Sequence, residues 1–262
     1  MTAPRSILIT GASSGIGEAL ARHYATTGVS LTLTGRDAER LAAVANACEA
    51  AGADVCAETV DVTDENAMAD LIARADATAP LDLVIANAGI SPSTAQDATD
   101  RDSRVRQVLD VNIGGVHNTI SPALKVMRAR GHGQIAIMAS LAAFVPTPGA
   151  ATYGASKAAI KSLGLALRAE NAGTGPGITV VCPGYVRSRI TENLNNPPQI
   201  MAGARAAALI ARRLERNPAV IVFPFLMGSL ARIAALVPDR ALVALMGIFL
   251  KPHPGEARPG DR

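Results

Sequence analysis

A glycine-rich turn near the start of the chain restricts the fold more than any other segment. Residues 5–10 are an apolar run around Ile7-Leu8-Ile9, which predicts a short buried strand. The turn Thr10-Gly11-Ala12-Ser13-Ser14-Gly15-Ile16-Gly17 follows, and residues 18–27 have the pattern of an amphipathic helix. This order is the setting of a dinucleotide-binding loop, where free amides of a helix N-terminus face a pyrophosphate. The spacing G-x-x-x-G-x-G is not the common one, so a plain αβ turn without a ligand is the alternative.

The same alternation of strand and helix continues along the chain. Further strands are expected at 29–34, 54–60, 81–86, 134–139, 178–182 and 220–223, and helices at 37–51, 64–77, 103–130 and 153–171. Repeated units of this kind predict an α/β fold: a Rossmann-type doubly wound parallel sheet of about seven strands, with helices on both faces. No linker or internal repeat interrupts them. We therefore expect one domain, with the cofactor and catalytic part at 1–224 and a short apolar helical C-terminal extension at 225–262.

Composition excludes several classes of protein. Apolar residues make up 49% of the 262 positions, enough for a large core, and the formal charge is only +3. Basic residues are spread out and aromatic residues are few, so nucleic acid is not an expected partner. Cys48, Cys56 and Cys182 have no metal-ligand spacing, and we expect no metal site. An odd number of cysteines and no room for a leader before the first strand predict a cytoplasmic location with reduced thiols.

The ends of the expected strands carry the informative residues. The second strand ends in Gly35-Arg36, where a basic residue accommodates the 2′-phosphate of NADP and an acidic one would bind NAD. The acidic Asp37 would favour NAD, although it stands where a helix N-cap is expected. Arg40 is either a second phosphate contact or a solvated helix residue. The later strands end in Asp61-Val62, Asn87-Ala88-Gly89, Ser140 and Pro183-Gly184.

Tyr153 and Lys157 stand four positions apart, so on a helix their side chains are neighbours. An adjacent ammonium favours a phenolate and lowers the pKa of the phenol, which suits proton exchange with a carbonyl or an alcohol. Taken alone, the pair is better explained as a half-buried aromatic residue with a snorkelling lysine.

The complete set of motifs resembles the short-chain dehydrogenase/reductase family over roughly residues 5–190. The motifs are Thr10-Gly11-x-x-x-Gly15-Ile16-Gly17, Asp61, Asn87-Ala88-Gly89, Asn112, Ser140, Tyr153-x-x-x-Lys157 and Pro183-Gly184. Each is weak alone, but their order and spacing together are specific. The resemblance implies hydride transfer between a nicotinamide cofactor and a carbonyl or alcohol group.

The resemblance also implies roles for single residues. Tyr153 would be the acid/base, Lys157 would lower its pKa and hold the nicotinamide ribose, Ser140 would bind the substrate oxygen, and Asn112 would support a water in a proton relay. The expected cofactor-binding residues are Gly11, Ser13, Ser14, Gly15, Ile16, Gly17, Arg36, Asp61, Val62, Asn87, Ala88, Gly89, Tyr153, Lys157, Pro183, Gly184, Val186 and Ser188. Two positions depart from the family pattern: Ser188 replaces a threonine and Ala86 replaces an asparagine.

The substrate is less defined than the chemistry. Residues 141–146 follow Ser140 and carry no charge, which favours an apolar, even lipid-like, substrate. Arg187 and Arg189 either hold an anionic group near the pocket or are solvated. After 220–223 come two short apolar helices, neither reaching the ~18 residues of a membrane span. They either pack on the core or on a second copy, or lie on the inner face of a membrane as a peripheral contact.

We therefore expect an NADP(H)-dependent oxidoreductase that interconverts a carbonyl and a secondary alcohol. The alternatives are a non-catalytic NADP-binding sensor or scaffold, and an NAD-dependent dehydrogenase that tolerates Arg36. Helices at about 105–130 and 153–171 resemble those through which the family dimerises, so a homo-oligomer, a dimer or a tetramer, is expected. The sequence does not name the substrate or the direction of the reaction.

Overall fold

A seven-stranded sheet in the order β3-β2-β1-β4-β5-β6-β7 forms the centre of the computed structural model, which describes residues 3–95, 100–146, 149–173, 175–192 and 199–249. Every neighbouring pair of strands is parallel. The strands are β1 (Ser6–Thr10), β2 (Ser30–Gly35), β3 (Asp54–Thr59), β4 (Leu83–Ala86), β5 (Gln134–Met138), β6 (Gly177–Pro183) and β7 (Val220–Phe223). The expected doubly wound sheet is confirmed.

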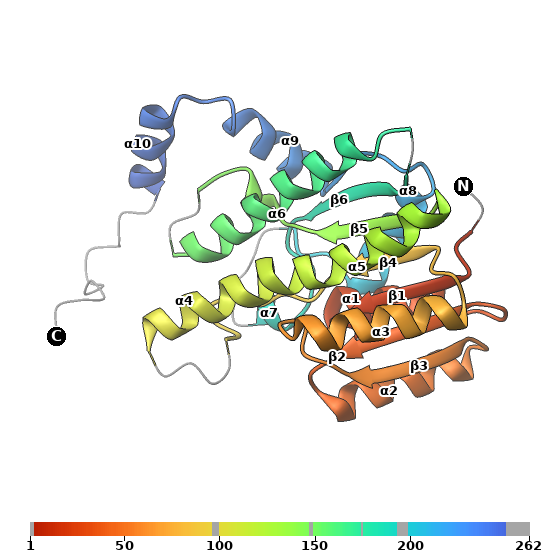
Figure 1. Cartoon of the computed structure of the whole chain (residues 1–262). Coiled ribbons are helices and arrows are strands. Elements are labelled where there is room, and N and C mark those ends of the chain that lie inside the picture. The colour runs from red at the N-terminus through yellow and green to blue at the C-terminus, as the bar shows by residue number, and fades with distance from the viewer. Residues whose placement is uncertain (1–2, 96–99, 147–148, 174, 193–198, 250–262) are drawn as a thin grey trace.

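Helices cover both faces of the sheet (Figure 1). One face is covered by α1 (Gly15–Tyr24), α2 (Ala38–Ala50) and α8 (Gly203–Leu214), and the other by α3 (Glu65–Thr78), α4 (Arg101–Leu109), α5 (Gly115–Arg130) and α6 (Ala151–Glu170). Each face has its own core. Alternation along β1 shows why: Ile7 and Ile9 belong to one core and Leu8 to the other, because successive side chains of a strand point to opposite faces.

Helix starts are set by acidic residues that cap free backbone amides. The Oδ1 atom of Asp37 accepts a hydrogen bond of 3.0 Å from the amide of Arg40, and Asp64 caps α3 in the same way through Ala67. Asp100 and Ser103 form a capping box at the start of α4.

Two features differ from the sequence prediction. Residues 103–130 were expected as one helix, but a π-helical turn, η1 (Asp110–Gly114), separates α4 from α5. Helix α8 was not expected at all, although its buried residues Ala206, Ala207, Ile210, Ala211 and Leu214 recur at helical spacing.

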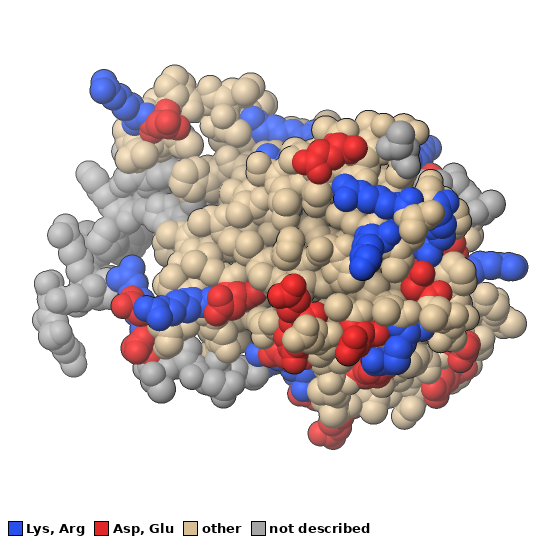
Figure 2. Space-filling model, viewed as in Figure 1, with Lys and Arg blue, Asp and Glu red and all other residues tan. Residues whose placement is uncertain are grey.

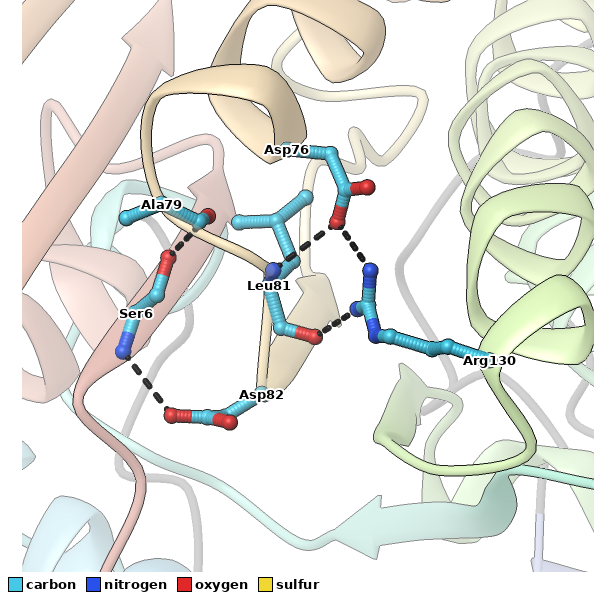
Figure 3. A network of polar contacts seen from close by, with 6 residues as sticks. All are labelled: Ser6, Asp76, Ala79, Leu81, Asp82 and Arg130. Atoms are coloured by element: carbon cyan, nitrogen blue, oxygen red, sulfur yellow. Dashed lines mark hydrogen bonds and ion pairs between the residues drawn. The ribbon is translucent and has the colours of Figure 1, made fainter.

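A polar network closes the amino-terminal edge of the sheet (Figure 3). Asp76 forms an ion pair of 2.6 Å with Arg130 and accepts the amide of Leu81 at 2.9 Å. Beside it, Asp82 accepts the amide of Ser6 at 3.2 Å. The Asp76 and Arg130 side chains are only 17% and 19% exposed, so the pair is largely withdrawn from water.

The chain continues past the sheet into α9 (Phe225–Ala234) and α10 (Asp239–Phe249). Two short elements lie earlier in the chain: η2 (Leu141–Ala143) follows β5, and α7 (Arg189–Glu192) follows β6. Helix α9 packs against β7 and η2, while α10 projects from the body of the protein (Figure 1). Residues 250–262 of the expected extension lie outside the described residues. None of the helices in the described part is both long and apolar enough to cross a membrane.

Candidate active site

A cleft of about 850 Å³ lies at the carboxyl-terminal edge of the sheet, where the ends of β1, β2, β4, β5 and β6 meet. Of the residues predicted from the sequence, those that line it are Gly11, Ser13, Ser14, Gly15, Ile16, Arg36, Asp61, Val62, Asn87, Ala88, Gly89, Ser140, Tyr153, Lys157, Pro183, Gly184, Val186 and Ser188. Gly17 and Asn112 lie behind the wall. The position agrees with the rule that ligands of such sheets bind outside the strand C-termini.

The glycines of the first turn are required by backbone geometry and by close packing. Gly11 has φ +66° and Gly15 has φ +62°, a left-handed conformation that other residues rarely adopt. A Cβ atom on Gly11 would stand 2.9 Å from the Cα of Ala88. A Cβ on Gly17 would stand 2.2 Å from the carbonyl oxygen of Gly11. Gly17 therefore brings α1 close to the turn and does not line the cleft.

Asn87, Ala88 and Gly89 form the adjacent wall. The Asn87 amide donates from Nδ2 to the carbonyl oxygens of Thr10 (2.9 Å) and Gly11 (3.2 Å), which ties the ends of β1 and β4 together. A Cβ on Gly89 would stand 3.1 Å from the Lys157 Nζ atom. Small residues are needed here because the chain passes directly over the lysine.

At the end of β2, Arg36 is exposed and borders the cleft. Asp37 is the N-cap of α2 as expected, and its Oδ2 atom forms an ion pair of 2.7 Å with Arg40. Both carboxylate oxygens of Asp37 are therefore engaged within α2. Asp61 is held in a similar way, because its Oδ1 atom accepts the amide and the hydroxyl of Thr63 at 2.9 and 2.8 Å.

Ser140, Tyr153 and Lys157 meet at the middle of the cleft. Ser140 follows β5, and its hydroxyl oxygen accepts the amide of Ala142 at 3.1 Å. Tyr153 and Lys157 lie on successive turns of α6, with the Lys157 Nζ atom 5.7 Å from the centre of the tyrosine ring. Nζ also donates a hydrogen bond of 2.9 Å to the carbonyl of Met138.

Burial dominates the proton affinities of this pair. Burial raises the pKa of Tyr153, a hydrogen bond with the Ser140 hydroxyl lowers it, and the nearby Tyr185 raises it. Burial lowers the pKa of Lys157 to about 8. Loss of water around the phenol is the largest of these effects and outweighs the hydrogen bond with Ser140. The lowering of the Tyr153 pKa by Lys157 stays a prediction.

Asn112 is fully buried in η1 and supports the wall of the cleft without lining it. Its Oδ1 atom accepts the amide of Ile90 at 2.8 Å, and its Nδ2 group donates to the carbonyl of Ile90 at 2.9 Å and to the Ser156 hydroxyl at 3.0 Å. The Ser156 hydroxyl donates in turn to the carbonyl of Tyr153 at 2.8 Å. The side chain thus joins the Asn87–Ile90 wall to the first turns of α6.

The far end of the cleft is mainly apolar. Of residues 141–146, which were expected to form this wall, Leu141, Ala142 and Val145 line it and the other three do not. Arg189 borders it, and Arg187 does not. The sequence prediction missed the residues that complete this end: Tyr185, Ile190, Thr191, Met227 and Ala231. Met227 and Ala231 come from α9, whose return to the strand ends has no local signal in the sequence.

Comparisons with known proteins agree with this arrangement. Residues 5–199 match the family model described as short chain dehydrogenase. An uncharacterized oxidoreductase of Myxococcus xanthus is 36% identical over 90% of this chain and 93% of its own. The galactitol 2-dehydrogenase of Cereibacter sphaeroides is 38% identical over 73% of this chain and 75% of its own. Among solved structures, a short-chain dehydrogenase from Sphingobium yanoikuyae in complex with NADPH is 25% identical, with a TM-score of 0.76 over 97% of this chain and 98% of that chain.

The fold and the cleft define a Rossmann-type, nucleotide-binding oxidoreductase. The chain belongs to the short-chain dehydrogenase family, and its activity is the interconversion of carbonyl and alcohol groups.

Proposed function

We propose that this protein is an NADP(H)-dependent oxidoreductase that reduces a carbonyl, or oxidises a secondary alcohol, on an apolar substrate. One observation carries the proposal: Ser140, Tyr153 and Lys157 meet in the same cleft that is bordered by a glycine turn suited to a pyrophosphate. A tuned acid and a dinucleotide cradle in one cleft are what hydride transfer to a carbonyl requires.

The residues at the cradle fit a dinucleotide. Gly11 and Gly15 leave the backbone open where a Cβ atom would collide with Ala88 or Ser188, and α1 begins at this point with free amides. The cofactor would be held by those of the predicted cofactor-binding residues that line the cleft. When bound, it supplies or accepts the hydride. Gly17 supports these residues by packing.

The chain's own residues would move the proton. Tyr153 would give its phenol proton to the substrate oxygen in reduction and take one back in oxidation. The Ser140 hydroxyl would bind the same oxygen and orient it. Lys157, with its pKa near 8, is largely an ammonium at neutral pH and would favour the phenolate of Tyr153 through space. Asn112 would keep the wall and α6 in position, and a water held there would connect Lys157 to solvent.

NADP is favoured over NAD by the end of β2. Arg36 is free to reach a 2′-phosphate, whereas Asp37, the residue that could bind ribose hydroxyls, is occupied with the α2 amide and Arg40. The Sphingobium relative was solved with NADPH, which agrees with this preference. An NAD-dependent enzyme remains the alternative.

Apolar residues at the far end of the cleft favour an apolar carbonyl substrate. We propose that 1–224 and 225–262 form one domain, since α9 supplies part of this wall. We also propose a cytoplasmic homo-oligomer that pairs through α4, α5 and α6. The expected peripheral membrane contact is linked to the substrate class, because α9 both lines the cleft and carries exposed apolar side chains.

The test is a Tyr153→Phe variant assayed for NADPH consumption over ketones graded by chain length and ring size. Removal of the proton donor should lower kcat at least about 10³-fold, while the affinity for NADPH stays nearly unchanged. Cofactor binding, followed by the fluorescence of NADPH, is the control for folding. Turnover close to that of the unmodified protein would refute Tyr153 as the acid. If the unmodified protein binds NADPH but turns over none of the compounds, a sensor or scaffold is the better interpretation.

A further inference from the structure

The C-terminal helices carry most of the exposed large apolar side chains of the described residues. Seven such side chains are exposed, and six of them lie between residues 225 and 243; the other is Ile200. The six, with their exposed fractions, are Phe225 (83%), Leu226 (58%), Leu230 (58%), Ile233 (62%), Leu236 (84%) and Val243 (68%). We call Phe225, Leu226, Leu230 and Ile233, together with Leu236 just after the end of the helix, the outer face of α9. A gathering of this kind marks an interaction site rather than ordinary surface.

The opposite side of α9 is fixed on the protein. Met227 and Ala231, one turn apart, line the cleft. Between them Gly228 is buried against β7, and a Cβ atom at this position would stand 2.3 Å from Cγ1 of Val222. This side of α9 is therefore packed closely against β7. The outer face therefore stays directed away from the core.

The size and the charge of the outer face favour a lipid surface over a second copy of the chain. A ten-residue helix is about 15 Å long and about 11 Å wide, so one half of its surface covers on the order of 250 Å². Each partner in a stable protein complex usually buries about 800 Å². The charged residues from 225 to 244 are Arg232, Asp239 and Arg240, a basic excess that suits anionic headgroups. Over the top left of Figure 2, where α9 and α10 lie in Figure 1, charged side chains are few.

We propose that the outer face of α9, with Val243 of α10, inserts into the surface of a membrane that contains anionic phospholipid. Insertion would be shallow, with the helix in the plane of the interface. The inference deepens the proposed function, on which its catalytic meaning rests: the helix that touches lipid on one side lines the substrate end of the cleft on the other. An apolar ketone dissolved in the bilayer would lie about 10 Å from the cleft, the width of one helix.

The experiment is flotation of the full chain with vesicles of phosphatidylcholine, with and without phosphatidylserine. The variant carries Leu230→Glu and Ile233→Glu, two outer-face residues that do not line the cleft. The control carries Ala43→Glu and Asn46→Glu, exposed on α2 with the same spacing and the same added charge. Because the variant replaces two apolar side chains that would be inserted with charged ones, it should bind at least about tenfold more weakly than the control.

Each outcome decides the proposal. Flotation of the unmodified chain and the control with phosphatidylserine vesicles, and loss of flotation in the variant, would support it. Failure of the unmodified chain to float, or equal flotation of the variant, would overturn it. A variant that changes only the oligomeric state, measured by light scattering, would assign the outer face to a second copy instead. Flotation needs no turnover, so failure of this inference and failure of the proposed activity are seen separately.

Discussion

At the amino-terminal edge of the sheet, Asp76 and Arg130 hold each other at 2.6 Å, and both also bind the backbone of Leu81. At the carboxyl-terminal edge, Lys157 is buried without a carboxylate partner among its described contacts, and its pKa falls to about 8. Both edges remove a basic side chain from water. Only the amino-terminal edge provides a countercharge, which is Asp76. The lysine at the carboxyl-terminal edge therefore has a pKa close to neutral pH and can gain or lose its proton there.

This difference predicts that removal of a charge has opposite effects on stability and activity at the two edges. The carboxyl-terminal edge should gain stability and lose activity when its charge is removed. The amino-terminal edge should lose stability and keep its activity.

The largest effect is expected for Lys157→Met. The variant should lower kcat at least about 100-fold, since Tyr153 loses the ammonium beside it. It should also be more stable at pH 7, by up to roughly 3 kcal/mol, because an ammonium with a pKa of about 8 when folded and about 10.5 when unfolded is costly to bury. The unfolded chain binds more protons between pH 8 and 10.5, so the stability of the unmodified protein should rise with pH there and the gap should narrow.

Urea unfolding from pH 7 to 9.5, with turnover measured in parallel, checks both halves of this prediction. Lys161→Met is the control: it removes a lysine one turn further along α6, over the Phe144 ring at 4.3 Å. An unchanged gap between the Lys157→Met variant and the unmodified protein across this pH range would contradict the assigned cost of burial.

A smaller effect is expected for Arg36→Asp, at the same edge but at the surface. Loss of a charge-assisted contact with a 2′-phosphate should weaken NADP binding about 30-fold and NAD binding much less. Titration of both cofactors by calorimetry measures the ratio. Arg40→Met serves as the comparison, because its charge is already paired with Asp37, and it should cost less than about threefold. Equal losses for NADP and NAD in the Arg36 variant would remove Arg36 from the phosphate site.

The smallest effect on activity is expected at the amino-terminal edge. Arg130→Met should destabilise the fold by about 2 kcal/mol, because it leaves Asp76 largely buried without its countercharge. NADPH-dependent kcat should stay the same. In a double variant, Asp76→Asn should recover part of the loss, which urea unfolding would detect. A fall in kcat without a fall in stability would show that the two edges are not independent.

The sequence predicted the sheet and the family because both depend on local patterns. Alternating buried strands, the spacing of Gly11, Gly15 and Gly17, and the pairing of Tyr153 with Lys157 are all visible within short segments. The rise of the Tyr153 pKa on burial was not visible in the sequence, because it is set by the distant side chains that surround the phenol. The contribution of Met227 was missed for a similar reason: its place at the cleft depends on Gly228 packing against Val222 in β7.

The π-helical turn at Asp110–Gly114 was also not predicted from the sequence. It restricts which changes of sequence this part of the chain can accept. A turn with an additional residue rotates everything after it by about 100° relative to a continuous α-helix. The π-helical turn therefore fixes the rotation of the apolar face of α5 relative to that of α4, and Asn112 lies within this turn. Exposed side chains of α4 can therefore be exchanged with little effect on the core, whereas a single insertion or deletion near Asn112 would turn Ile120 and Leu124 of α5 away from the sheet.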